Sequence, residues 1–154
     1  MSAQTYDVTA RKGHQATMAV LVLLGFVLGG LVTDWIGVAL VGVAGLIMLA
    51  GRFWWPADVV RQFIWRVAEP RGLVKRRDRV EDHETRRVAR IMGGVAWLLA
   101  AALIALGAGI AGWVIALLVT VMIVLDASFD FCALCFVFLH LERRGLLPAA
   151  LRHQ

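Results

Sequence analysis

Two cysteines and two aspartates gather near the end of the chain, in the stretch Asp-Ala-Ser-Phe-Asp-Phe-Cys-Ala-Leu-Cys of residues 126–135. Cys132 and Cys135 are the two cysteines of the sequence, and they are three residues apart. On a helix this spacing puts both sulfurs on one face, about 5–6 Å apart at Cβ, where they could form a disulfide or supply two metal ligands. Asp126 and Asp130 could relay protons or simply mark the end of an apolar span.

Three interpretations of the cysteine pair stay open. In thiol or sulfur chemistry, Cys132 would attack as the first thiol and Cys135 would resolve the intermediate. The nearby carboxylate of Asp130 disfavours a thiolate unless it acts as a proton acceptor. A metal site would require more ligands, from a second C-x-x-C across a dimer or from histidines of polar segments. Alternatively, both cysteines are small buried apolar residues. The polar-segment histidines are His14, His83 and His153.

Composition places the chain among membrane proteins. Of its 154 residues 60% are apolar and only 18% are charged, against about 25% charged residues in a soluble domain. Two cysteines are too few for a disulfide framework. The sequence contains no Gly-rich phosphate loop, no Ser-His-Asp set and no His-Glu-x-x-His helix, so no cofactor is expected.

Four apolar runs are long enough to cross a hydrocarbon core of about 30 Å, which takes about 20 helical residues. They cover residues 16–32, 35–53, 88–109 and 111–130. The last run crosses only if its helix continues through Asp126, which places this carboxylate near the membrane boundary. A cleaved signal peptide does not fit the first run, because a second apolar run follows at once. The sequence therefore predicts an all-α integral membrane protein, one domain with four transmembrane helices in two hairpins.

The basic residues predict the topology. All 16 Lys and Arg residues lie in the N-terminal segment, in residues 52–90 or in the C-terminal tail, and none lies in the turns within the hairpins. The positive-inside rule then puts both termini and the central linker in the cytoplasm. Because these charges flank apolar spans, interaction with anionic lipid explains them more simply than binding to nucleic acid. No nucleic-acid partner is therefore expected.

The segment between the hairpins has two parts. Apolar residues recur at helical spacing in residues 57–68, between Pro56 and Pro70, which predicts an amphipathic helix lying on the membrane. A helix packed on the protein itself is the alternative. Residues 70–87 are predicted to be a basic cytoplasmic linker. Residues 131–142 are predicted to be a second interfacial segment, which holds the C-x-x-C. Residues 1–15 are predicted to be loosely ordered. The polar face of the first helix would hold Asp58, Arg61, Gln62 and Arg66.

Two further patterns concern packing. Trp35 and Trp113 each open the second helix of a hairpin, 78 residues apart, as in a weak internal repeat. Gly25 and Gly29 form a G-x-x-x-G pair, which is typical of close helix packing either within a chain or in a homo-oligomer.

The chain resembles a known family at specific residues. The stretches E-D-H-E-T-R-R-V-A-R-I-M-G-G (residues 81–94) and D-A-S-F-D-F-C-A-L-C-F-V-F (residues 126–138), with Gly-His-Gln-Ala at 13–16, resemble domain-of-unknown-function family 4395 of bacterial membrane proteins. Its members share the hairpin–basic linker–hairpin layout and a closing G-F-C-x-G-C, and here Asp130 and Leu134 stand where glycine is usual. The resemblance implies a bacterial plasma-membrane location and an association with thioredoxin-like or sulfurtransferase (rhodanese-like) proteins.

Together these features give one functional hypothesis and two alternatives. The hypothesis is a thiol–disulfide or sulfur-relay partner at the cytoplasmic face, with Cys132, Cys135, Asp130 and Asp126 as its catalytic residues. The alternatives are a non-enzymatic membrane subunit or scaffold with structural cysteines, and half of a dimeric metal site. The sequence specifies neither the substrate nor the oligomeric state. It does not favour a transporter, because no broken helix or charge at mid-membrane is predicted.

Overall fold

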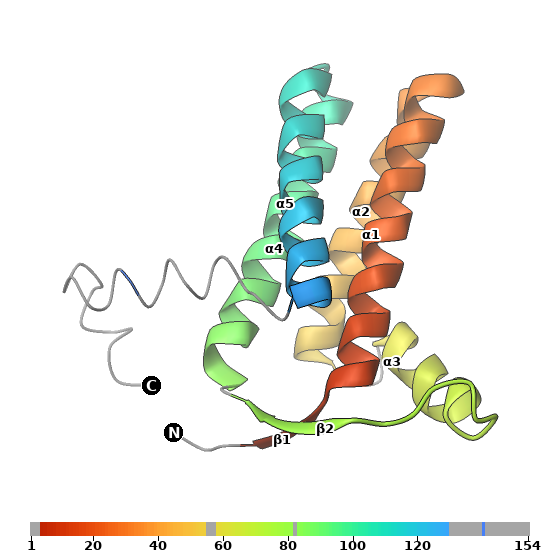
Figure 1. Cartoon of the computed structure of the whole chain (residues 1–154). Coiled ribbons are helices and arrows are strands. Elements are labelled where there is room, and N and C mark those ends of the chain that lie inside the picture. The colour runs from red at the N-terminus through yellow and green to blue at the C-terminus, as the bar shows by residue number, and fades with distance from the viewer. Residues whose placement is uncertain (1–3, 55–57, 82, 130–139, 141–154) are drawn as a thin grey trace.

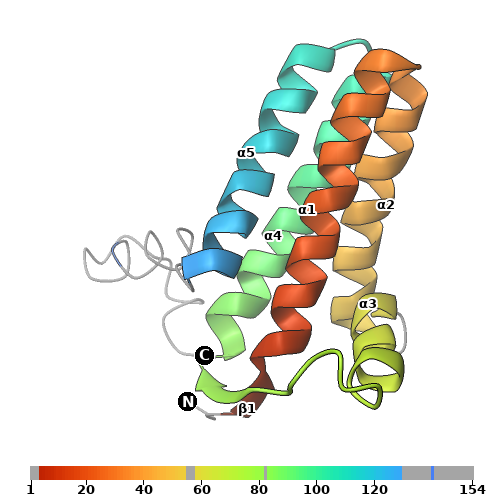
Figure 2. The same ribbon diagram turned by 45° about the vertical axis from the view of Figure 1, so that its right-hand side comes forward.

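The computed structural model describes residues 4–54, 58–81, 83–129 and 140. Four long helices stand side by side as a bundle, and two short strands and a shorter helix gather at one end of it (Figures 1 and 2). The long helices are α1 (Val8–Leu31), α2 (Asp34–Phe53), α4 (His83–Ala105) and α5 (Gly109–Phe129).

All four helices are long and apolar enough to cross a membrane, and the predicted all-α fold of two helical hairpins is confirmed. The 21 residues of α5 correspond to about 31 Å at 1.5 Å per residue, so this helix passes through Asp126 without a break. Every described Lys and Arg belongs to the end of the bundle where α1 begins and α5 ends. This end is called the basic end below, and the protein is a multi-pass membrane protein.

The hairpin turns lie at the opposite end. In the second hairpin the backbone N–H of Gly107 donates to the carbonyl of Ile104 at 3.1 Å, and that of Ala108 donates to Leu103 at 2.9 Å. These two bonds form a Schellman cap, which needs a left-handed residue after the helix, and Gly107 adopts φ +87°. The cap ends α4 and lets α5 begin two residues later.

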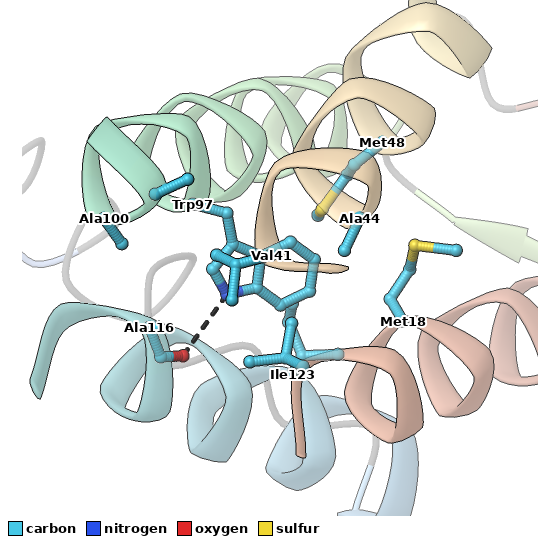
Figure 3. Close-up of a cluster of buried hydrophobic side chains, with 10 residues drawn as sticks. Met18, Val41, Ala44, Met48, Trp97, Ala100, Ala116 and Ile123 are labelled. Atoms are coloured by element: carbon cyan, nitrogen blue, oxygen red, sulfur yellow. Dashed lines mark hydrogen bonds between the residues drawn. The ribbon is translucent and has the colours of Figure 1, made fainter. Parts of the chain in front are cut away.

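Trp97 is the centre of the packed core (Figure 3). Its side chain is fully buried between Met18 of α1, Val41 of α2 and Ile123 of α5, among other apolar residues. A buried indole N–H needs an acceptor, and here it donates to the carbonyl of Ala116 at 3.2 Å. The tryptophan therefore joins α4 to α5 by a hydrogen bond while its ring contacts the first hairpin.

Small residues bring the helices of the first hairpin close together. A methyl group on Gly37 would come within 3.1 Å of the carbonyl oxygen of Gly25 and within 2.7 Å of the Trp113 ring. A methyl group on Gly29 would likewise meet the Gly37 Cα at 3.3 Å. The G-x-x-x-G pair of α1 therefore packs within the chain, against α2.

The two halves differ at their matching tryptophans. Trp113 lies over Gly29 and Gly37 and makes an edge-to-face contact with Phe26, with ring centroids 5.2 Å apart. Trp35, its counterpart at the 78-residue offset, is 69% exposed. The two tryptophans at matching positions of the weak repeat therefore pack differently.

The N-terminal segment differs from the expected loose structure. Strand β1 (Gln4–Asp7) pairs antiparallel with β2 (Asp78–Glu81) of the linker, so that Gln4 faces Glu81 and Asp7 faces Asp78. α1 begins directly afterwards at Val8, whose backbone N–H donates to the carbonyl of Arg77 at 2.8 Å. The start of the chain and the linker thus form one small ribbon across the basic end.

The helix between the hairpins has an unexpected orientation. α3 (Val59–Phe63) continues as one π-helical turn, η2 (Ile64–Ala68), and both contact the start of α1. The polar side chains of Asp58 and Arg61, expected on a solvated face, are buried against the bundle, whereas Val59 and Phe63 are 63% and 61% exposed. The helix therefore packs on the protein by a mixed side, where Asp58 and Arg61 are buried together with Ala68, and it presents Val59 and Phe63 outward.

Candidate functional site

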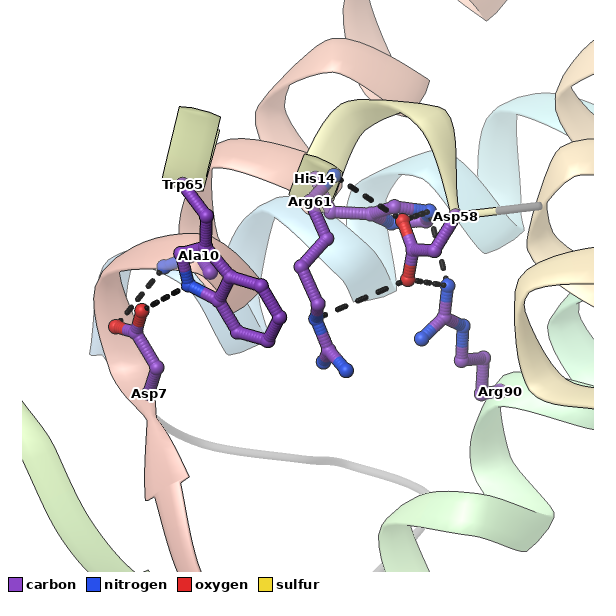
Figure 4. A network of polar contacts seen from close by, with 7 residues as sticks. All are labelled: Asp7, Ala10, His14, Asp58, Arg61, Trp65 and Arg90. Carbon is purple, nitrogen blue, oxygen red and sulfur yellow. Dashed lines mark hydrogen bonds and ion pairs between the residues drawn. The ribbon is translucent and has the colours of Figure 1, made fainter. Parts of the chain in front are cut away.

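The described polar side chains that are buried lie mostly at the basic end, around the start of α1. Asp7 is the N-cap of that helix: its Oδ1 accepts the backbone N–H groups of Thr9 at 3.0 Å and Ala10 at 3.2 Å. Its Oδ2 accepts the indole N–H of Trp65 from η2 at 2.8 Å (Figure 4). Because the first N–H groups of a helix have no partners within it, this carboxylate satisfies them and fixes η2 at the same time.

Asp58 is the centre of a second, more deeply buried group. It is 2% exposed, caps α3 by accepting the backbone N–H of Arg61 at 3.3 Å, and accepts Nη2 of Arg90 from α4 at 2.8 Å. Figure 4 shows the side chains of Arg61, Arg90 and His14 converging on this one carboxylate from three helices. A carboxylate removed from water in this way is tolerated only when it is paired and hydrogen-bonded.

The charge of Asp58 is set by competing effects. Burial by itself raises the pKa of the carboxyl, but the hydrogen bond from Arg90 and the positive charges of Arg90 and Arg61 outweigh it and hold the pKa below its usual value. Asp58 is therefore ionised at neutral pH and acts as the counter-charge of this network.

His14 has a defined role in the same network. Nη2 of Arg90 lies 3.0 Å from Nε2 of His14, and a guanidinium can only donate, so this imidazole nitrogen is the acceptor. The ring is then neutral, with its proton on Nδ1. Nε2 also lies 3.6 Å from Oδ1 of Asp58, which is too long for a hydrogen bond. His14 therefore orients Arg90 rather than pairing with Asp58.

Arg61 completes the group from the side of α3. Its Nε lies 3.9 Å from Oδ2 of Asp58, and its guanidinium lies 5.5 Å from the centre of the Trp65 ring. A guanidinium over an indole face gains a cation–π interaction. Asp7, Trp65, Arg61, Asp58, His14 and Arg90 thus form one connected chain of contacts, called the polar network below.

A further polar contact joins α1 to α5. The side-chain amide of Gln15, the residue after His14, donates to Oδ2 of Asp126. Asp126 lies in the last turns of α5, three residues before Phe129, where that helix ends. Of the predicted site residues, Asp126 is thus bound to α1 at the residue that follows His14. Asp130, Cys132 and Cys135 lie outside the described residues, and their predicted roles stay predictions.

The polar network was not predicted as a site. The sequence predicts His14 as a possible metal ligand and Asp58 and Arg61 on the polar face of an amphipathic helix. His14 and Gln15 nevertheless belong to the Gly-His-Gln-Ala stretch at 13–16. Two features could have indicated the network: a histidine within the first turns of an apolar helix, and an aspartate directly after a proline-marked break. Within the described part of the chain, no group of three His, Cys, Asp or Glu side chains is arranged to hold a metal ion.

Comparison with known proteins places the chain in a family. A family model described as "Domain of unknown function (DUF4395)" matches residues 7–143. The chain belongs to the DUF4395 family. The match begins at Asp7, the cap of α1, and covers all four long helices, the polar network and the C-x-x-C segment. No curated protein matches the chain, and no solved structure does.

Proposed function

We propose that this DUF4395 member is a thiol–disulfide or sulfur-relay partner that works through Cys132 and Cys135 at the basic end of the bundle. One observation carries the proposal: α5 runs unbroken through Asp126 to Phe129, where Asp126 is bound by Gln15 of α1. Three peptide units separate Phe129 from Cys132 and span at most about 11 Å. Covalent connectivity therefore keeps the first thiol near the basic end, whatever path the segment takes.

The distribution of charge supports access from the cytoplasm. The described Lys and Arg residues all belong to the basic end, and the hairpin turns near Thr33 and Gly107 contain none. By the positive-inside rule this end faces the cytoplasm of a bacterial plasma membrane, with both termini inside. A soluble thioredoxin-like or rhodanese-like protein could then reach the cysteine pair.

The proposed exchange has two steps. The Cys132 thiolate attacks a disulfide of the partner, which forms a mixed disulfide and releases one partner thiolate. The Cys135 thiolate then attacks Cys132, which forms the intramolecular disulfide and releases the second partner thiolate. Two electrons pass from the cysteine pair to the partner. Asp126 and Asp130 are the proposed acceptors of the protons lost by the two thiols, and a thioredoxin-like dithiol would reduce the pair again.

A second candidate function is a non-enzymatic membrane subunit or scaffold. The observation that favours it is the polar network itself, in which Arg90 binds both Asp58 and His14 and so joins three helices. Such a network stabilises the arrangement of helices without performing chemistry. In that case both cysteines are packing residues, or supply half of a metal site in a dimer.

Thiol trapping in membranes distinguishes these functions. Acid-quenched membranes treated with a maleimide reagent should show reduced and oxidised forms as a gel shift. Cys132→Ser should abolish the oxidised form and any cross-link to a partner, whereas Cys135→Ser should accumulate the mixed disulfide because the resolving thiol is missing. Ala133→Ser, which changes the same segment but keeps both thiols, is the matched control and should behave as the wild type.

The double variant Cys132→Ser/Cys135→Ser decides between the two functions. If it is inserted, stable and indistinguishable from the wild type in partner capture and in cell phenotype, the cysteines are structural. The subunit function then replaces the relay. Metal analysis of the purified dimer, with the same double variant as blank, tests the half-site alternative.

A further inference from the structure

The segment of residues 59–75 presents an apolar and basic surface at the basic end. Val59, Phe63 and Arg66 recur at i, i+4 and i+7, so they share the face of α3 and η2 that turns away from the bundle. Exposed Pro70 and Arg71 follow, then a turn, and Lys75 is exposed as well. The residues Val59, Phe63, Leu73, Arg66, Arg71 and Lys75 are called the interfacial patch.

A structured turn holds the outer part of this patch. The backbone N–H of Gly72 donates to Glu69 at 3.0 Å and that of Leu73 donates to Ala68 at 3.0 Å, the two bonds of a Schellman cap. Gly72 adopts the left-handed φ of +70° that this cap requires. The residue that follows the left-handed glycine of such a cap often packs back on the helix, but here that residue, Leu73, is 73% exposed. An apolar residue is thus held outward in an ordered turn.

Two apolar side chains of α3 point away from the bundle. Asp58, Val60 and Arg61 lie on the side of α3 that contacts the bundle, whereas Val59 and Phe63 are 63% and 61% exposed. An apolar environment would therefore stabilise these two side chains by removing them from water.

The end of the neighbouring helix α2 indicates which apolar environment surrounds these side chains. α2 ends at Phe53 and is followed by Trp54, and both aromatic side chains are strongly exposed. Exposed tryptophan at the end of a membrane-crossing helix is typical of the boundary between headgroups and acyl chains. α3 lies beside the lower end of α1 at this same level (Figures 1 and 2). The outward face of α3 is therefore at lipid depth rather than in bulk water.

The charge of the segment selects the headgroup. Between residues 59 and 77 there are six Lys or Arg and a single acid, Glu69. Arg66, Arg71 and Lys75 are exposed around the apolar side chains. We propose that the interfacial patch is a binding surface for anionic phospholipid: the phosphodiester headgroups lie against Arg66, Arg71 and Lys75, and Val59, Phe63 and Leu73 insert among the acyl chains.

The test is lipid binding by the purified full-length protein in a neutral detergent. Dioctanoyl phosphatidylglycerol and dioctanoyl phosphatidylcholine are titrated separately, and bound lipid is counted by native mass spectrometry. We expect phosphatidylglycerol to bind about a hundredfold more tightly, or about fivefold for each of the three exposed basic residues. The difference should shrink at high salt, because the screening length falls from about 10 Å at 0.1 M to about 3 Å at 1 M.

Two triple variants with the same loss of charge make the result specific. Arg66→Gln/Arg71→Gln/Lys75→Gln should remove the preference for phosphatidylglycerol, and Arg143→Gln/Arg144→Gln/Arg152→Gln should keep it. Unchanged circular dichroism of both variants shows that the fold is intact. Equal loss in both variants would mean that net charge alone attracts the lipid and would overturn the proposal. Equal affinity of the wild type for the two lipids would also overturn it and leave a protein partner as the occupant.

Discussion

Replacing Asp58 by alanine should be the most costly change of a polar side chain in the described structure. Asp58 is 2% exposed and is the counter-charge of Arg90, whose Nη2 lies 2.8 Å away. Removing one partner of a buried ion pair costs about 3–5 kcal/mol, because the remaining charge stays out of water without compensation. Loss of the cap of α3 adds about 1 kcal/mol. We therefore expect Asp58→Ala to lower the free energy of unfolding by about 4–6 kcal/mol.

A double-mutant cycle with Arg90 separates charge pairing from other effects. Asp58→Leu and Arg90→Met should each cost about 3–5 kcal/mol for the same reason, whereas the double variant Asp58→Leu/Arg90→Met removes both charges and should lie within about 2 kcal/mol of the wild type. The coupling energy should therefore be several kcal/mol. It should clearly exceed the average of about 0.6 kcal/mol measured for hydrogen bonds between membrane helices.

The measurement is equilibrium unfolding of the purified protein in mixed micelles, followed by circular dichroism as the fraction of denaturing detergent rises. Asp34→Ala is the control, since Asp34 is an exposed carboxylate in the first turn of α2. Its loss should cost only the helix-dipole contribution of about 0.3–1 kcal/mol. If Asp58→Ala costs no more than Asp34→Ala, or if the coupling with Arg90 is within about 0.6 kcal/mol of zero, pairing with Arg90 does not hold the network together.

Two more predictions follow from the packing and from the charge of the network. Gly37→Ala should lower the free energy of unfolding by about 1–3 kcal/mol, because its methyl group would meet Trp113 at 2.7 Å, whereas Gly30→Ala, with nothing within 4 Å, should be neutral or slightly stabilising in the same assay. The pKa of Asp58 is lower in the folded than in the unfolded protein, so its ionised form stabilises the fold. This stabilisation is fully present above the unfolded pKa of about 4, and it is lost as the pH falls through the folded pKa. The stability difference between wild type and Asp58→Asn should then be constant from about pH 5 to 8 and shrink below about pH 4; a difference that grows on acidification would contradict the assigned charge.

The membrane-crossing helices could be predicted from the sequence because the bilayer imposes a length and a composition that each segment must satisfy alone. The polar network could not be predicted in the same way. α3 and η2 together are short, and the burial of Asp58 in them depends on its partner Arg90 in another helix. His14, which accepts a hydrogen bond from Arg90, lies 76 positions before it in the chain.

The ribbon of β1 and β2 could not be predicted from the sequence either. Its strands are four residues each, carry no alternation of apolar and polar side chains, and join segments more than 70 residues apart in the chain. Local patterns therefore do not distinguish them from loops. Asp126 was predicted near the membrane boundary from the length of its span, but its partner Gln15 belongs to another helix and could not be inferred from spacing.

The position of Arg90 has a consequence for the order of events during synthesis. Asp58 leaves the ribosome 32 residues before Arg90, which corresponds to about 2–6 s at 5–20 residues per second. During that interval the first hairpin is complete and Arg61 is already present, but the buried carboxylate lacks its hydrogen-bonded partner Arg90 and the polar network is incomplete. The two hairpins are consequently not independent folding units: the first hairpin reaches its final form only after the second begins to enter the membrane.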